Sequence, residues 1–310
     1  MPVFPRHNTA TLAILTSIVV VGTVLSIKNE SWLDTSNPLL SHLPHPHQGK
    51  SYFASKRTIL NRVFVKYAWA WTSAVFWAVW IGADENEAKG GVKTLDQAGK
   101  WLGTTLVWGG FASWFFGPSL FSRIVALTGG ECVVYMPAPQ GAPQAAGIQP
   151  PPPHYIAIPA EFCTNPTIVT PESHPALFAH PPLAEYLAQG MGFDRAYKIV
   201  PKLTKGHDIS GHTFLLTLST LFLVDALVKA RKGKATPVAL VTQLAGWALV
   251  GLWATMLWAT AVYFHTWQEK ASGFVLAIVG FVFSQYPFEP SAARPPVPRI
   301  VVNERPHTEW

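Results

Sequence analysis

Charged residues are scarce in this sequence. Lys, Arg, Asp and Glu together make up 13% of its 310 residues, whereas 49% are apolar, and large apolar side chains are supplied by 13 Trp and 18 Phe. This balance excludes an ordinary water-soluble domain, in which about a quarter of the residues are charged. A helix needs about 20 mostly apolar residues to cross a bilayer, and several stretches meet that requirement. The sequence therefore predicts a membrane protein.

Sorting and binding signals are lacking too. The first apolar run is followed by SIKNESW, which offers no small-residue cleavage site, so we expect a retained span instead of a cleaved signal peptide. The final NERPHTEW contains no retrieval or lipidation motif. The net charge of +6 is spread among the apolar runs and does not cluster on one soluble face, so we expect no nucleic-acid partner.

The apolar runs predict a single all-α, polytopic membrane domain that covers residues 1–310. The six predicted transmembrane helices are 9–27, 63–82, 101–127, 211–228, 238–264 and 271–286. Trp and Tyr gather near several of their ends, as they do at membrane interfaces. A soluble protein with buried helices is the alternative, and so many long apolar runs argue against it.

The loop between the fourth and fifth runs indicates the orientation. Its charged residues are all basic: Lys229, Arg231, Lys232 and Lys234. Short basic loops favour the cytosolic side. Both termini and the tail at 287–310 would then be cytosolic, and the large loop at 129–205 would be lumenal. Lys56, Arg57 and Arg62 beside the second run argue against this orientation. Within the lumenal loop, a disulfide between Cys132 and Cys163 and two free thiols are equal alternatives, and a Pro-rich insert predicts extended chain.

Polar residues collect where the fourth apolar run begins, in KLTKGHDISGHTFLL. Asp208 and Ser210 suit the N-cap of the helix that Gly211 begins, which is a purely structural explanation. It does not explain His212 in the first turn. The free N–H groups and the dipole of a helix N-terminus favour an anion such as phosphate. A histidine at that place can protonate a leaving oxygen.

A second histidine stands at the far end of the fifth run, in TAVYFHTWQEK. His265 and Glu269 are four residues apart, so they share a face in a helical turn. The carboxylate would fix one ring nitrogen and leave the other as nucleophile or base. If the fourth and fifth runs are antiparallel neighbours, His212 and His265 lie at the same membrane level. The sequence therefore predicts a phosphate-chemistry site at one edge of the membrane.

Simpler explanations compete with this hypothesis. A lone interfacial histidine can be a polar anchor, and Glu269 with Lys270 can be a solvated pair in a short loop. A metal site is a further alternative, but no spacing here is a strong ligand signature. Its ligands would be His207, Asp208, His212 and His265.

These stretches resemble known signature motifs. SGH at 210–212 and H-x3-E-x3-G at 265–273 are similar to the second and third motifs of the lipid phosphate phosphatase superfamily. More specifically, DISGHTFLL and AVYFHTWQEK resemble the signature strings of the fat storage-inducing transmembrane (FIT) family, and LTGGEC resembles a weaker one. The resemblance covers most of the chain and implies a helical core like that of the lipid phosphate phosphatases.

The resemblance implies an endoplasmic reticulum protein that supports lipid droplet formation and phospholipid balance. The family is described as fatty acyl-CoA diphosphatases, hydrolases that split the CoA phosphoanhydride to give acyl 4′-phosphopantetheine and adenosine 3′,5′-bisphosphate. We expect no cofactor and no metal. The family is also described as binding triacylglycerol and diacylglycerol. A non-catalytic lipid-binding protein and a lipid phosphate phosphatase are therefore the alternatives.

The superfamily roles can be carried over to residues of this chain. His265 would be the nucleophile that forms a phosphohistidine, Glu269 would orient it, and His212 would protonate the leaving group. The residues expected to bind substrate are Asp208, Ser210, Gly211 and Lys205.

One departure from the superfamily pattern concerns positive charge. The superfamily has an arginine six residues before the nucleophilic histidine, and this chain has Ala259 there. Loss of such electrostatic help usually costs orders of magnitude in rate, so another cation must replace it. The lysines near the motifs are the candidates: Lys198, Lys202, Lys205 and Lys270.

Overall fold

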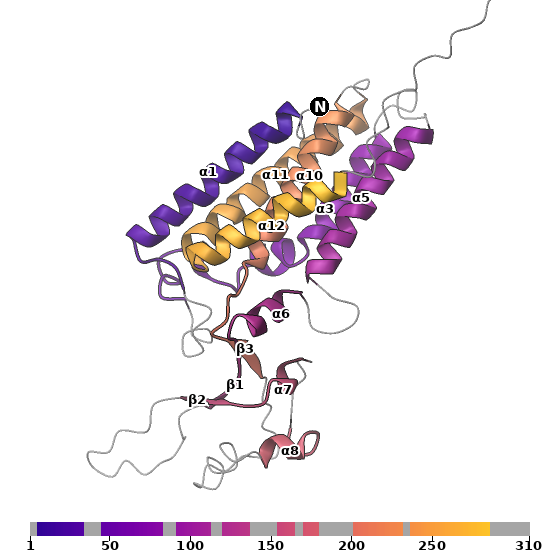
Figure 1. Cartoon of the computed structure of the whole chain (residues 1–310). Helices are drawn as coiled ribbons and strands as arrows, with labels where there is room; N and C mark the ends of the chain where they lie inside the picture. The colour runs from indigo at the N-terminus through magenta and orange to yellow at the C-terminus, as the bar shows by residue number, and fades with distance from the viewer. Residues whose placement is uncertain are drawn as a thin grey trace, which may run out of the picture.

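The computed structural model describes residues 5–33, 45–82, 91–112, 120–136, 154–164, 170–179, 201–231 and 236–285. The long helices in these ranges are α1 (Arg6–Lys28), α3 (Ala68–Gly82), α5 (Gly91–Ala112), α10 (Gly211–Ala230), α11 (Pro237–Tyr263) and α12 (Trp267–Gln285). They lie side by side in one bundle (Figure 1). The shorter helical elements are η1 (Tyr52–Ala54), a π-helical turn η2 (Leu60–Val65), α6 (Leu120–Leu127), α7 (Glu161–Thr164) and α8 (Pro175–Phe178).

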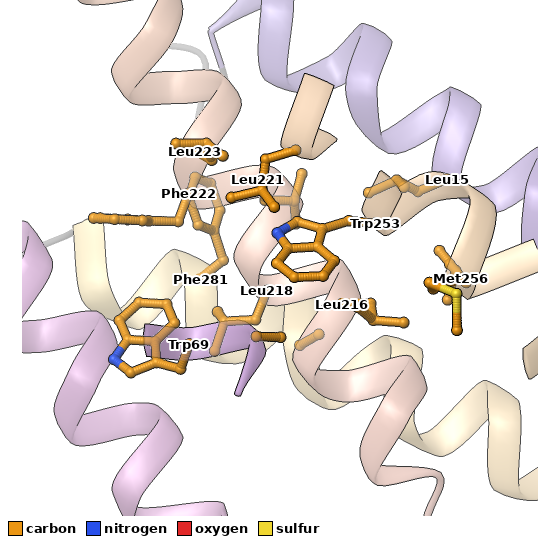
Figure 2. Close-up of a cluster of buried hydrophobic side chains, with 14 of the residues drawn as sticks. Leu15, Trp69, Leu216, Leu218, Leu221, Phe222, Leu223, Trp253, Met256 and Phe281 are labelled. Atoms are coloured by element: carbon orange, nitrogen blue, oxygen red, sulfur yellow. The ribbon is translucent and has the colours of Figure 1, made fainter. Parts of the chain in front are cut away.

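Helix α10 is the centre of the bundle because it packs against α1, α3, α5, α11 and α12. Its most apolar window is 78% buried, compared with 22% in α1 and 17% in α11. A helix that is apolar all round is buried by its neighbours or by lipid. In Figure 2, Trp253 of α11 lies against Leu218 and Leu221 of α10, and its indole Nε1 donates a 3.1 Å hydrogen bond to Thr72 Oγ1 of α3.

Three of the described helices are long and apolar enough to cross a membrane: α1, α10 and α11. The predicted runs 9–27, 211–228, 238–264 and 271–286 nearly coincide with helices α1, α10, α11 and α12. The predicted run 63–82 begins in η2 and continues as α3, which is shorter than expected. The described part of the chain is mostly helical, as the composition predicts.

The prediction of one long helix at 101–127 is wrong. Helix α5 starts earlier, at Gly91, and ends at Ala112, and α6 is a separate helix from Leu120 to Leu127. The sequence between the two contains Gly117-Pro118, a combination that breaks helices because proline lacks an N–H and clashes with the preceding turn.

The 129–205 loop contains a small sheet that the all-α prediction missed. Strand β1 (Glu131–Met136) pairs antiparallel with β2 (His154–Ala157) on one side and with β3 (Lys202–Thr204) on the other. A disulfide joins Cys132 to Cys163, with a Cα–Cα distance of 5.8 Å, which decides between the two alternatives for these cysteines. Most of the Pro-rich insert and the tail at 287–310 lie outside the described residues.

The sheet and the candidate catalytic histidines are at the same end of the bundle. The N-terminus and the C-terminal end of α10 lie at the opposite end (Figure 1). Strand β3 leads into the N-terminus of α10, and a three-residue turn joins the end of α11 to the start of α12 at that same end. The antiparallel arrangement of α10 and α11 therefore brings the two sequence motifs together.

Candidate active site

The turn between α11 and α12 positions His265. Phe264 ends α11 in an extended conformation, and His265 has a φ of 60°, in the left-handed region that non-glycine residues rarely adopt. Thr266 and Glu269 then form a capping box at the start of α12. The backbone N–H of Thr266 donates to Glu269 Oε2 at 2.8 Å, and the N–H of Glu269 donates to Thr266 Oγ1 at 3.4 Å. The spacing of Thr266 and Glu269 in HTWQE at 265–269 thus has a local structural cause.

Glu269 has a second contact, which orients His265. Its Oε2 lies 3.3 Å from His265 Nδ1, and the carboxylate side chain is only 4% exposed. A carboxylate on Nδ1 fixes the imidazole tautomer and the ring plane. Nε2 is then the ring nitrogen that is left to react with a substrate. A left-handed backbone at a polar residue in a cavity is strain of the kind that collects at functional sites.

The N-terminus of α10 is tied to α12. The hydroxyl of Ser210 caps α10 by accepting from the N–H of Thr213 at 3.3 Å, and the N–H of Ser210 donates to the carbonyl of Glu269 at 3.1 Å. A Cβ on Gly273 would lie 2.6 Å from the carbonyl oxygen of Ser210, so only glycine allows this approach. Ser210 is fully buried: its hydroxyl caps α10, its N–H bonds to α12, and it is not among the described residues that line the cavity.

His212 is held by a residue from the segment before α3. Its Nε2 lies 3.0 Å from Asn61 Oδ1, and Asn61 in turn donates from Nδ2 to the carbonyl of Lys56 at 2.8 Å. Because Nε2 donates its hydrogen to the amide oxygen of Asn61, Nδ1 is the ring nitrogen of His212 that is left for proton transfer. The polar segment before the second apolar run carries no sequence signal for this contact, which is why sequence reasoning missed Asn61.

His212 and His265 line one cavity of about 310 Å³. Its polar lining also includes Asp208, Asn61 and two lysines, Lys56 and Lys202. Its apolar lining consists of Phe53, Leu203, Met256, Ala259 and Phe264. The structure therefore brings three of the expected site residues, Asp208, His212 and His265, to one space, with Glu269 directly behind His265.

Lys202 was among the lysines expected to supply positive charge, and it lines the described cavity. The second lysine in the lining, Lys56, was not among them. Lys56 lies with its Nζ 6.0 Å from the Phe264 ring centroid, and burial of the ammonium, followed by the nearby charge of Lys202, lowers the pKa of Lys56. Its charge is thus poorly hydrated and available to an anion. Both lysines line the same cavity as Ala259, the position at which the superfamily resemblance predicts an arginine.

The other lysines near the motifs are engaged away from the cavity. Lys205, expected to bind substrate, donates to Glu131 Oε2 at 2.8 Å, and this hydrogen bond raises the pKa of Lys205. Lys270 is buried and donates to the carbonyl of Ala261 at 2.7 Å. Lys198 lies outside the described residues.

A metal site finds no support in the geometry. His207 Nε2 lies 2.9 Å from Ser272 Oγ, so its ring contacts α12. Within the described ranges, no group of three or more His, Cys, Asp or Glu side chains is close enough to hold a metal ion. The described cavity instead presents two histidines, two lysines and Asp208, with Glu269 behind His265.

The bundle and this site define a class of protein: a helical membrane protein with a paired-histidine cavity at one end of its helices. The chain belongs to the fat storage-inducing transmembrane (FIT) protein family, whose sequence model matches residues 49–237 and 228–284. This match includes both histidine motifs and the segment that carries Asn61.

Named relatives are similar over most of the chain. Acyl-coenzyme A diphosphatase fit1 of Schizosaccharomyces pombe is 26% identical over 287 residues, which cover 90% of this chain and 86% of the relative. Acyl-coenzyme A diphosphatase FITM2 is 28% identical in Homo sapiens, over 84% of this chain and 79% of the relative. In Mus musculus it is 29% identical, over 78% and 72%. No solved structure is significantly similar to this chain.

Proposed function

We propose that this protein is a fatty acyl-CoA diphosphatase. The observation that carries the proposal is the joint presence of His212 and His265 in one cavity that also holds Lys56 and Lys202. The names of the relatives support the same reaction. The products would be acyl 4′-phosphopantetheine and adenosine 3′,5′-bisphosphate, and the reaction is a hydrolysis of a phosphoanhydride bond.

The side chains suit a two-step displacement. His265 Nε2 attacks one phosphorus of the anhydride, forming an N–P bond as the bridging P–O bond breaks, and protonated His212 gives its Nδ1 proton to the leaving oxygen. Neutral His212 then takes a proton from water as the water oxygen attacks the phosphohistidine. The N–P bond breaks, the phosphate product leaves, and both histidines return to their starting states. Glu269 stabilises the charge on His265 throughout.

Lys56 and Lys202 would supply the positive charge that the superfamily arginine supplies elsewhere. The bound anhydride is anionic, and charge on the bridging oxygen grows as the P–O bond breaks. Cations in a partly dehydrated cavity stabilise that charge more strongly than cations in water. Asp208, which also lines the cavity, moderates the repulsion between the two lysines, because its charge acts on Lys56 in the opposite sense to that of Lys202.

The same geometry supports a proposal for the membrane placement. We propose that α1, α3, α5, α10, α11 and α12 all cross the endoplasmic reticulum membrane, with the N-terminus in the cytosol and the cavity at the lumenal face. The Cys132–Cys163 disulfide at the cavity end supports this orientation, because disulfides persist in oxidising compartments. An acyl chain can then stay in the bilayer while the CoA head reaches the histidines. A position in the endoplasmic reticulum membrane would also allow a role in lipid droplet formation, with contacts to triacylglycerol and diacylglycerol.

Product analysis tests the function. Purified protein is incubated with an acyl-CoA, and the products are identified by mass. We expect adenosine 3′,5′-bisphosphate, and we expect its formation to be lost in His212→Ala and His265→Ala variants that still fold. Release of inorganic phosphate from lysophosphatidic acid, with acyl-CoA left intact, would instead indicate a lipid phosphate phosphatase. Full turnover of acyl-CoA by both histidine variants would reject the site.

A further inference from the structure

A second cavity of about 400 Å³ adjoins the one that holds His265. The two cavities share Lys56, Asn61 and His212 in their linings. The rest of the second lining consists of Arg62, Val65, Lys66, Gly211 and Leu215. His212 therefore stands between two adjoining spaces, with His265 in the lining of the first only.

The charge of the second cavity is one-sided. Among the described residues, its lining includes the cations Lys56, Arg62 and Lys66 and no Asp or Glu, whereas the first cavity includes Asp208. Arg62 belongs to η2 and Lys66 is the residue that ends it, so the two cations are four apart on one helical segment. Three positive charges without an acid favour a multiply charged anion, and arginine suits phosphate oxygens in particular.

The direction of the proposed reaction assigns this space to one half of the substrate. In an in-line displacement, nucleophile and leaving group are on opposite sides of the phosphorus. His265 is the nucleophile and His212 protonates the leaving oxygen, so the leaving group extends past His212, away from His265. The second cavity, which His212 lines and His265 does not, is the adjoining space available for that group.

We propose that the second cavity is a subsite for the 3′-phosphate of the CoA head group, a phosphate that the reaction leaves intact. This inference rests on the proposed function. The adenosine half is then the first leaving group, and the phosphohistidine carries the acyl-phosphopantetheine half. Arg62 and Lys66 bind the 3′-phosphate, while Val65 and Leu215 provide an apolar wall for the nucleoside. The subsite makes the enzyme select CoA esters over other pyrophosphates.

The test compares acyl-CoA with the same acyl-CoA lacking the 3′-phosphate. Full-length protein is assayed in phosphatidylcholine vesicles, and kcat/KM is measured for each substrate. We expect wild type to favour acyl-CoA by about tenfold or more, mainly through KM, because the missing phosphate leaves a positive site unpaired. The Arg62→Gln/Lys66→Gln variant should bring this ratio close to one. Arg57→Gln is the matched control, because Arg57 lines neither cavity, and it should leave the ratio unchanged.

Two results of the assay in phosphatidylcholine vesicles would overturn the subsite. One is equal use of both substrates by wild type. The other is an equal loss of both activities in the double variant. A lipid headgroup is the other source of phosphate, so the assays are repeated with phosphatidylserine in the vesicles. If the double variant differs from wild type only in those vesicles, the cavity binds lipid and the subsite proposal is wrong.

Failure of the proposed function gives a different result. Wild type would then hydrolyse neither substrate, and binding decides the question. Calorimetry with adenosine 3′,5′-bisphosphate and with adenosine 5′-monophosphate measures the contribution of the 3′-phosphate directly. Tighter binding of the bisphosphate by wild type, lost in Arg62→Gln/Lys66→Gln, supports the subsite, and equal binding of the two nucleotides by wild type refutes it.

Discussion

His212 on α10 and Asn61 in η2 are joined through a 3.0 Å contact between Nε2 and Oδ1, although 151 residues separate them in the sequence. This contact links the first turn of the central helix to the segment that leads into α3. It also leaves Nδ1 as the nitrogen of His212 for the proposed proton transfer. The orientation of the proposed acid therefore depends on a side chain from another helix.

Asn61→Ala should lower kcat by about 10- to 100-fold, because loss of a hydrogen bond that orients a catalytic histidine has effects of that size. KM should change much less, because the ring itself remains. The measurement is steady-state hydrolysis of acyl-CoA by wild type, Asn61→Ala, His212→Ala and the double variant. Since Asn61 acts through His212, the double variant should be no slower than His212→Ala. An additive further loss would contradict this dependence.

Glu269→Gln should abolish most activity, by about 10³- to 10⁴-fold, because an amide no longer stabilises the charged ring of His265. The matched control is Thr266→Ala, which removes one half of the capping box and leaves the 3.3 Å contact between Glu269 and His265 in place. It should cost about 1 kcal/mol in the free energy of unfolding and retain most turnover. Comparable activity loss in the two variants would mean that Glu269 acts only as a cap.

The left-handed φ of 60° at His265 predicts an order of stability. Replacement by Gly should give a more stable protein than replacement by Ala, by about 1 kcal/mol, because only glycine adopts this backbone without a Cβ penalty. Thermal unfolding of both variants in the same detergent measures the difference, and both should be inactive. A more stable Ala variant would show that the turn relaxes when the imidazole is removed.

Gly273→Ala should destabilise the protein by about 1–3 kcal/mol, because the added methyl would lie 2.6 Å from the carbonyl oxygen of Ser210 and force α12 away from α10. Activity should fall as well, since Glu269 is on the displaced helix. Gly251→Ala is the control: it is inside α11, no described atom beyond the neighbouring backbone of its own helix lies within 4 Å of its added Cβ, and helix propensity should make it neutral or stabilising. Equal unfolding temperatures for the two variants would refute the close-approach argument.

The apolar runs predicted most of the long helices because burial in lipid or in a bundle requires about 20 consecutive apolar residues whatever the neighbouring helices are. The runs at 211–228 and 238–264 match α10 and α11 closely for this reason. The error at 101–127 arose because hydropathy alone takes no account of Gly117-Pro118, a pair that disfavours a helix on sequence grounds. The sheet was missed because its strands are short and β3 is separated from β1 by 65 residues of sequence.

The sequence by itself predicted the side chains to which we assign the chemistry: a histidine in the first turn of α10 and a second histidine four residues before a carboxylate. These features are local, since they depend on spacing within one or two helical turns. Tertiary structure alone decided which cations and which amide complete the site. Lys56 and Asn61 are brought there, and Lys205 is drawn to Glu131, by the packing of elements far apart in sequence. Contacts between distant segments depend on how the whole bundle packs. The residues that make them show no periodic sequence pattern from which the contacts could be predicted.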